Sequence, residues 1–294
     1  FVFGALISPT DPVSVLGVLR EENVPASLQS AVAGESLFND GVGIVVFTIL
    51  LGAAVTGADF SLGEGARLFV IEAGGGVAMG LMIGWLGFRA LRSMDEYTLE
   101  VLITLAVVMG GYALCSQLHV SGPLAMAVAG LLIGNQGANL AMSDQTLDYV
   151  NKFWELVDEV LNSVLFLLIG LEVIALVPGI RELLFGLAAI VITLVARAVA
   201  VGGAIKAIPA ARLSTPGSGR VLWWGGLRGG ISVALALSLP EGSTRDLLLA
   251  ATFAAVLFSV LVQRATLGKL IDRLKAKHSP VMEDSGERSG LGAD

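Results

Sequence analysis

Long apolar stretches recur along the whole of this chain, and each has about the length of a membrane-spanning helix. A helix needs about 20 apolar residues to cross the hydrocarbon core of a bilayer. The chain is therefore predicted to be an all-α polytopic membrane protein. Nine stretches meet or approach the required length: 1–19, 27–56, 66–88, 97–118, 121–135, 155–177, 181–206, 218–239 and 245–267.

The composition agrees with this prediction and excludes the other broad classes. Only 15% of the residues are charged and 55% are hydrophobic, whereas soluble domains carry about 25% charged residues. Such a chain cannot cover a water-facing surface, and it has too many apolar residues to be disordered. The single cysteine, Cys115, excludes an internal disulfide and a paired-cysteine metal site. The net charge of −7 argues against a nucleic-acid partner, which requires a basic face.

The distribution of basic residues predicts the orientation. With a cytoplasmic C-terminus, twelve Lys and Arg residues fall on the cytoplasmic side and only Arg67, Arg181 and Arg245 fall on the other. Cytoplasmic loops are normally the more basic ones. We therefore expect a multi-pass protein of the cell membrane, with a disordered cytoplasmic tail over 274–294. Because Phe1 already lies within an apolar run, we also expect helices to precede it.

Gly76, Gly80 and Gly84 form a stripe of small residues on the third segment. Glycines spaced four apart share one helix face and permit the close approach of another helix. Packing within the chain is the simpler interpretation, and a specific dimer contact is the alternative.

The first segment is interrupted by the sequence Ser8-Pro9-Thr10-Asp11-Pro12. Both prolines lack an amide hydrogen, and Pro12 disfavours the helical conformation at Asp11. We expect two half-helices joined by an unwound stretch, which a membrane tolerates only against protein or a water-filled cavity. Carbonyl groups and helix ends freed in this way commonly coordinate a cation. A simple proline kink is the alternative, but a kink does not require an acid at bilayer depth.

Two acids and two neutral polar residues interrupt the apolar pattern of 27–56, in the motif GESLFNDG. Glu35 and Asn39 share one helix face, and Ser36 and Asp40 share the neighbouring one. Adjacent polar stripes on an apolar helix indicate a binding site. The alternative is that the helix begins near Asp40 and the acids lie in an aqueous loop, but the length of the segment favours an intramembrane position.

Two arginines lie inside apolar segments, where an unpaired cation is costly. Arg197 is expected to pair with an acid, and Glu35 is the nominated partner. Arg228 lies within the glycine-rich motif GGLRGG of the eighth segment, which is expected to break this helix too. Two roles are open for Arg228: it compensates exposed helix carbonyls, or it extends to the cytoplasmic surface. Paired broken segments point to a transporter with inverted repeats.

Three motifs in this order resemble the monovalent cation:proton antiporters of the NhaP-like sodium/proton exchanger branch. They are GALISPTDPVSVL, GESLFNDGVGIVVF and WWGGLRGGISVALALSLP, and the resemblance covers essentially all of 1–273. It implies an inverted-repeat fold of thirteen helices, of which about nine are present here. It also implies two broken helices that cross, 1–19 and 218–239, and a homodimer.

The resemblance further implies a division into domains. The core transport domain would comprise 1–56, as a first part truncated at its N-terminus, and 181–273 as a second part. A linking helix would lie within 57–96, and 97–180 would supply the dimer-interface helices.

For the site, the resemblance implies that the Asp40 carboxylate binds the cation and the proton in turn. Na⁺ would lie at Asp40, Ser36 and Thr10. Asn39 stands where the electrogenic branch has a second aspartate, which implies electroneutral exchange of one cation for one proton. The residues carried over by motif are Asp40, Asn39, Ser36, Thr10 and Asp11 for ion binding, Glu35 and Arg197 as a structural ion pair, and Arg228 as support for the broken helices.

These observations favour a secondary transporter, not an enzyme, that exchanges Na⁺ or Li⁺ for H⁺ and needs no cofactor. A K⁺/H⁺ antiporter of the same fold is the first alternative. An intramembrane aspartyl protease using Asp11 and Asp40 is less favoured, because no GxGD motif occurs, and the absence of an HExxH motif excludes an intramembrane zinc protease. A channel is disfavoured because acids on broken helices suit binding and release better than free conduction.

Overall fold

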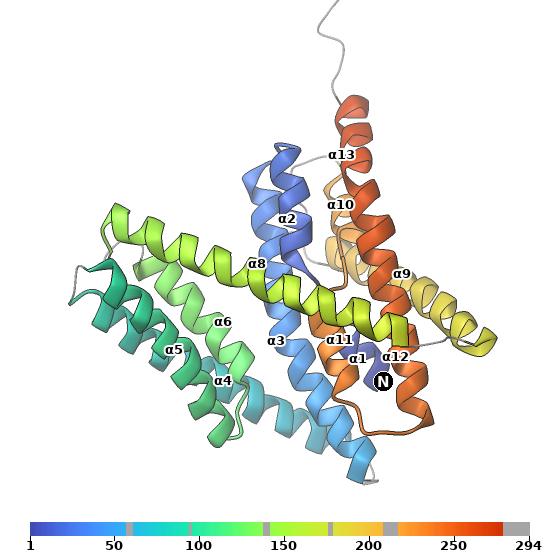
Figure 1. Ribbon diagram of the computed structural model, residues 1–294, viewed down its shortest axis with the longest axis horizontal. Helices are drawn as coiled ribbons and strands as arrows, with labels where there is room; N and C mark the ends of the chain where they lie inside the picture. Colours follow the sequence, from blue (N-terminus) through green and yellow to red (C-terminus); the bar gives the residue numbers. More distant parts are fainter. Residues whose placement is uncertain (57–60, 94–95, 138–141, 176–178, 208–216, 279–294) are drawn as a thin grey trace, which may run out of the picture.

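The computed structural model describes residues 1–56, 61–93, 96–137, 142–175, 179–207 and 217–278. Over these residues the chain consists of helices and loops without a strand (Figure 1), which confirms the predicted all-α class. Within the described part, five helical stretches are long and apolar enough to span a membrane: α3 (Ala26–Thr56), α4 (Leu62–Leu91), α5 (Tyr97–Gln117), α9 (Ile180–Ala207) and Thr244–Ala276.

The stretch Thr244–Ala276 combines three elements without a break: α12 (Ser243–Phe258), the π-helical turn η3 (Ser259–Gln263) and α13 (Arg264–His278). The helix therefore continues past residue 273, where the tail was expected to begin. Residues 279–294 of that expected tail lie outside the described residues.

Both predicted interruptions are present. The first segment forms α1 (Val2–Leu6) and α2 (Pro12–Glu21), and the eighth forms α10 (Ser218–Trp224) and α11 (Gly230–Leu237). The first break follows from the two prolines, and the second coincides with the glycine-rich motif.

Two further helices complete the described chain. The short α6 (Gly122–Leu132) continues into the π-helical turn η1 (Ile133–Gly137). Helix α8 (Asp144–Ala175) begins well before the apolar run predicted at 155–177. Its polar first turns are held against α5, since Tyr149 stacks on Tyr97 and Trp154 Nε1 donates to Thr104 Oγ1 at 3.1 Å.

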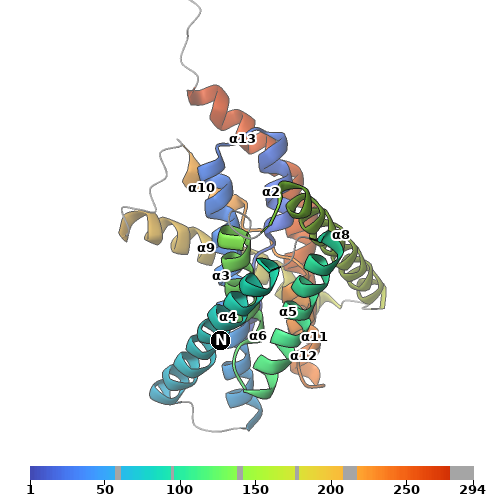
Figure 2. The same cartoon turned by 90° about the vertical axis from the view of Figure 1, so that its left-hand side faces the viewer.

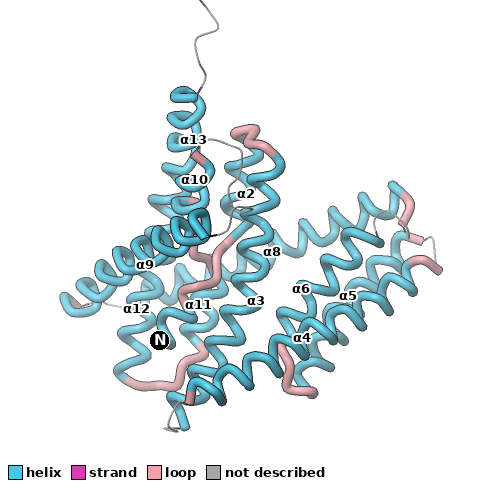
Figure 3. The backbone as a smooth tube through the Cα atoms, turned by 180° about the vertical axis from the view of Figure 1, so that it is seen from behind, coloured by secondary structure: helices cyan, strands magenta, loops and turns pink. Residues whose placement is uncertain are grey.

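The helices form two groups, which are joined by α8 and by direct contacts of α3 with α4 and α6 (Figure 1). Helices α4, α5 and α6 pack together in one group, and α1–α3 pack with α10–α13 in the other. Helix α8 contacts α5 in the first group and α11 in the second. Helix α9 packs on α12 and lies on the face of the bundle opposite α8, as the views from the side and from behind show (Figures 2 and 3).

The glycine stripe of α4 packs against α6 of the same chain. A Cβ atom at Gly76 would lie 2.8 Å from the carbonyl oxygen of Ser121, and one at Gly84 would lie 2.8 Å from Cα of Ala129. Gly80 meets Ala125 in the same way. The stripe therefore brings two backbones of one chain together, as the simpler interpretation predicted.

This packing predicts that Gly84→Ala destabilises the protein, because the new methyl group meets the backbone of α6. Overpacking of this kind costs about 1–3 kcal/mol. The matched control is Gly74→Ala on the same helix, where a Cβ would meet nothing within 4 Å. Thermal unfolding of the purified protein in detergent, followed by tryptophan fluorescence, should give a lower midpoint for Gly84→Ala only. Equal midpoints for the two variants would contradict the packing argument.

An exposed ion pair joins the ends of the second group. Lys275 Nζ of α13 lies 3.0 Å from Glu22 Oε2, directly after α2. The hydrogen bond from Lys275 holds the pKa of the Glu22 carboxyl below its usual value. Because the folded pKa is lowered, the stabilisation is present above the ordinary glutamate pKa and is lost as the pH falls through the folded pKa.

We therefore expect Glu22→Gln to lower the unfolding midpoint slightly at pH 7 and to have a smaller effect at pH 3. The pair is exposed, so the difference should also shrink in high salt. The measurement is the difference in midpoint between the two proteins across this pH range. A difference that persists undiminished at pH 3 would show that the charge pair is not its source.

Candidate ion-binding site

The two unwound stretches, 7–11 and 225–229, cross in the interior of the bundle (Figure 3). The amide nitrogen of Asp11 donates a hydrogen bond of 2.8 Å to the carbonyl oxygen of Leu227. The crossing brings together the C-terminal ends of α1 and α10 and the N-terminal ends of α2 and α11. Backbone groups without helical partners are thereby concentrated at one place in the apolar part of the chain.

Arg228 is directed at the carbonyl groups of the first stretch. Its Nη1 atom donates to the carbonyl oxygens of Ser8 at 2.6 Å and Pro9 at 3.2 Å. The residue is only 7% exposed, so its side chain does not extend to an aqueous surface. Of the two roles left open by the sequence, the geometry corresponds to compensation of the helix end.

Asp11 caps the N-terminus of α2. Its Oδ1 atom accepts from the amides of Val13 and Ser14 at 3.0 and 3.3 Å, and Oδ2 accepts from the Ser14 hydroxyl at 2.6 Å. Pro12 occupies the first helical position, where the missing amide hydrogen is not needed. A Cβ at Gly229 would lie 2.8 Å from the Asp11 Cβ, so glycine permits this close approach. Both carboxylate oxygens of Asp11 are thus already engaged.

Asp40 is held against the first unwound stretch by a single hydrogen bond. Its Oδ1 atom accepts from the amide of Thr10 at 3.0 Å. The Thr10 hydroxyl donates to the Ser36 hydroxyl at 3.0 Å, and each of these two residues is 4% exposed. The Asn39 side-chain amide donates to the carbonyl oxygen of Ser8 at 3.1 Å. The polar stripes predicted on 27–56 therefore face the predicted break.

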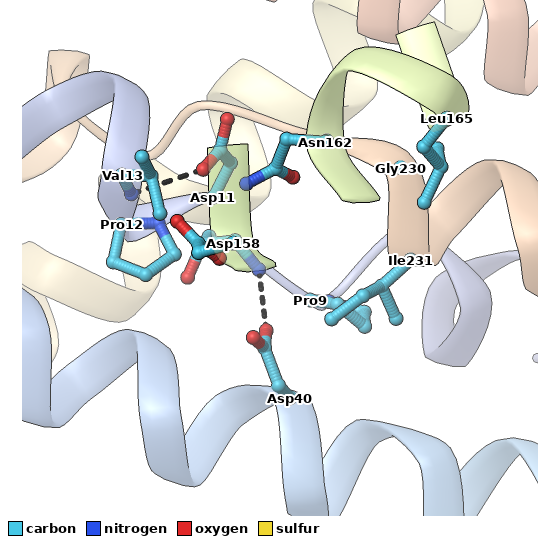
Figure 4. Close-up of a pocket in the computed structure, with 12 residues that line it drawn as sticks. Pro9, Asp11, Pro12, Val13, Asp40, Asp158, Asn162, Leu165, Gly230 and Ile231 are labelled. Carbon is cyan, nitrogen blue, oxygen red and sulfur yellow. Dashed lines mark hydrogen bonds between the residues drawn. The ribbon is translucent and has the colours of Figure 1, made fainter. Parts of the chain in front are cut away.

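A cavity of about 190 Å³ lies beside these residues (Figure 4). This volume is enough for several water molecules or a partly hydrated cation. Its lining includes three carboxylates and no basic side chain, so it favours a cation. The lining residues are Pro9, Thr10, Asp11, Pro12, Val13, Asp40, Asp158, Asn162, Leu165, Gly229, Gly230 and Ile231.

The cavity brings together only some of the predicted site residues. Asp40, Thr10 and Asp11 line it, whereas Ser36 and Asn39 reach it only through their hydrogen bonds to the unwound stretch. Among the described residues, no group of three or more His, Cys, Asp or Glu side chains is arranged to hold a metal ion. The chemistry present is that of carboxylate oxygens together with neutral oxygen donors.

Two lining residues, Asp158 and Asn162 of α8, are absent from the sequence prediction. The resemblance implies that 155–177 belongs to the dimer-interface helices, and it names no site residue there. The available signal was an acid and an amide four residues apart in ELVDEVLNSVLFLLIGL, which share one helix face. Their neighbours Glu155 and Glu159 do not line the cavity, so the pattern alone could not have selected them.

Glu35 and Arg197, the nominated pair, are in contact. Arg197 Nη1 lies 2.7 Å from Glu35 Oε1, and the two side chains are 9% and 35% exposed, respectively. The Nε and Nη2 atoms of Arg197 donate to the carbonyl oxygen of Leu222 at 3.2 and 2.8 Å. The guanidinium group packs directly against Gly226, where any Cβ would collide with it. Arg197 thus joins α9, α3 and the end of α10.

Gln263 binds a backbone carbonyl at the second break, and the sequence did not predict this role. Its side-chain amide donates to the carbonyl oxygen of Trp224 at 3.0 Å, and its side-chain oxygen accepts from the Ser259 hydroxyl at 2.7 Å. Both residues belong to the π-helical turn η3, a kind of irregularity that often occurs at functional sites. The last carbonyl of α10 is satisfied in this way.

Crossed, interrupted helices beside an intramembrane carboxylate define a class of secondary transporters. The sequence model of the family described as "Sodium/hydrogen exchanger, transmembrane" matches residues 1–272. The chain belongs to this family, and it is a multi-pass membrane protein.

Individual relatives agree with this assignment. Over 94% of its length the chain is 50% identical to the Na⁺/H⁺ antiporter NhaP of Pseudomonas aeruginosa, of which it covers 66%. It is 39% identical to the Na⁺/H⁺ antiporter NhaH of Halobacillus dabanensis, and this match covers 93% of the chain and 68% of that relative. The chain therefore spans about two thirds of the length of these relatives.

A solved structure has the same fold. The sodium proton antiporter MjNhaP1 from Methanocaldococcus jannaschii superimposes with a TM-score of 0.73. The match covers 93% of this chain and 70% of that one at 21% sequence identity. The described helices thus adopt an antiporter fold, as the resemblance implied.

The contact geometry predicts that Glu35 and Arg197 act as a unit. Glu35→Gln and Arg197→Gln should each destabilise the protein by about 1–3 kcal/mol, because each leaves a partly buried charge without its partner. The double variant should lose less than the sum of the two. Unfolding midpoints of the four proteins in the same detergent provide the test. Strictly additive losses would contradict a direct pair.

Proposed function

We propose that this protein exchanges one Na⁺ or Li⁺ for one H⁺ across the membrane, by competition of the two ions for Asp40. The observation that carries the proposal is the position of this carboxylate. It lies on α3, lines the cavity, and receives only the Thr10 amide as a hydrogen-bond donor among the described residues. The second oxygen is thereby left for an ion. The names of the relatives, which are Na⁺/H⁺ antiporters, support the choice of ions.

The residues around Asp40 suit a small hard cation. Such a cation loses part of its hydration shell on binding, so the site must supply a full negative charge and further oxygen atoms. Asp40 supplies the charge, and the Thr10 hydroxyl, linked to Ser36, supplies a neutral oxygen at the cavity wall. A proton neutralises the same carboxylate. One ion must therefore leave before the other binds, and this exclusion couples the two fluxes.

Asn39 keeps the exchange electroneutral in this mechanism. Its amide is uncharged and holds the carbonyl of Ser8. Only the charge of Asp40 then alternates between a proton and a cation. The loaded site has the same net charge in both directions of transport.

The remaining parts of the proposal concern the whole protein. The core domain of 1–56 and 181–273 would move against the helices of 97–180, which would lie at a homodimer interface, and 57–96 would link them. The C-terminus would be cytoplasmic in a bacterial plasma membrane. The end of α2, which carries Arg20 in its last turn, lies beside α13, since Lys275 is paired with Glu22, and these basic residues support this orientation.

The test is proton flux in proteoliposomes that contain the protein, followed by a pH-sensitive dye after addition of Na⁺, Li⁺ or K⁺. We expect saturable flux with Na⁺ or Li⁺ that is the same with the membrane potential clamped or imposed. Asp40→Asn should reduce it at least tenfold, because the variant side chain has no titratable charge.

The control variant is Asp246→Asn, an exposed acid at the start of α12, which should transport normally. Full cation-coupled flux in Asp40→Asn would contradict the competition mechanism. Flux that follows the membrane potential would contradict the role given to Asn39. Flux with K⁺ alone would replace Na⁺/H⁺ exchange by K⁺/H⁺ exchange.

A further inference from the structure

Asp158 faces Asp40 and Asp11 across the cavity (Figure 4). It comes from α8, whereas the other two carboxylates come from α3 and the first unwound stretch. Its carboxylate is close enough to Asp11 for the two to interact electrostatically. A third acid in this place is unfavourable for the protein alone, since like charges repel in a medium of low dielectric constant. A bound cation would remove the repulsion.

One face of α8 forms this wall of the cavity. Asp158, Asn162 and Leu165 follow each other at intervals of four and three residues, which places them in one row. Leu165 packs so closely on α11 that any Cβ at Gly230 would collide with it. One turn before Asp158, the Trp154 indole is bonded to Thr104 of α5. Asp158 is therefore held between two fixed contacts of α8.

The three carboxylates are not equivalent. Both oxygens of Asp11 are engaged in capping α2, and one oxygen of Asp40 is engaged by Thr10. The partner of Asp158 is Asn162, one turn away on the same helix. Among the described residues, Asp158 is therefore the one carboxylate of the cavity that forms no hydrogen bond with the two crossing stretches.

We infer that Asp158 is an affinity-determining residue of the cation site, which supplies a second negative charge from α8 opposite Asp40. The inference rests on the proposed exchange at Asp40 and adds the group that determines how strongly the cation is attracted there. Asp158 acts through its charge on the cation in the cavity and takes no part in the alternation of proton and cation on Asp40. Its removal should weaken cation binding without stopping turnover.

The experiment measures cation-dependent proton flux at pH 8 for four variants of the protein in proteoliposomes. We expect Asp158→Asn to raise the KM for Na⁺ about fivefold or more, with a maximal rate within twofold of the unmodified protein. Asp158→Glu, which keeps the charge, should restore the KM to within twofold. Asn162→Asp adds a charge one turn away and should lower the KM.

The matched control is Glu159→Gln. It neutralises the adjacent acid on the same helix, and Glu159 does not line the cavity. We expect its KM to stay within twofold. An unchanged KM in Asp158→Asn would overturn the inference. An equal rise of the KM in Glu159→Gln would also overturn it, because any nearby negative charge would then have the same effect. A loss of maximal rate in Asp158→Asn that Asp158→Glu does not rescue would overturn it too.

These outcomes separate the inference from the proposed function. If the unmodified protein shows Na⁺-dependent flux that Asp40→Asn abolishes, the proposed function stands whatever Asp158 does. If the unmodified protein shows no such flux while its elution profile and unfolding midpoint indicate a folded protein, the proposed function fails and the inference fails with it.

Discussion

The structure depends on satisfying the backbone groups that two interrupted helices release inside the membrane. An unsatisfied carbonyl or amide costs several kcal/mol in a bilayer core, where no bulk water is available. Each break has its own partners. Arg228 and Asn39 bind the carbonyl of Ser8, and Arg197 and Gln263 bind carbonyls of α10. The amide of Asp11 joins the two breaks directly.

The need to satisfy these backbone groups gives most of the charged residues near the breaks a structural role. Asp11 and Arg228 lie at the positive and negative helix ends created by the crossing, where the helix dipoles favour their charges. Glu35 neutralises Arg197, which is itself occupied with α10. Within the part of the chain that the structure describes, Asp40 has no such structural task beyond one hydrogen bond from the Thr10 amide. In the proposed exchange, a carboxylate that the backbone does not occupy is free to exchange its counterion.

The sequence alone predicts the parts of this arrangement that depend on local chemistry. Prolines determine the first break, the GGLRGG motif marks the second, and the spacing of Glu35, Ser36, Asn39 and Asp40 predicts the polar stripes. Local patterns do not reveal which remote group each side chain meets. Gln263 reaches Trp224 only because a π-helical turn rotates it inward, and Asp158 reaches the cavity only because α8 crosses the bundle. The early start of α8 likewise follows from packing on α5, not from apolar periodicity.

If the proposed exchange proceeds by alternating access, the composition of the cavity wall affects it. Asp40 and Thr10 are bonded to each other and lie in the same group of helices, so their contact survives a movement of that group as a body. Asp158 lies on α8, between the contact of this helix with α5 and its contact with α11. A movement that shifted α8 along α11 would change the distance from Asp158 to Asp40 while leaving the contact between Asp40 and Thr10 unchanged. The same movement that opens a path for the cation would then also alter the charge around it, so that access and affinity change together.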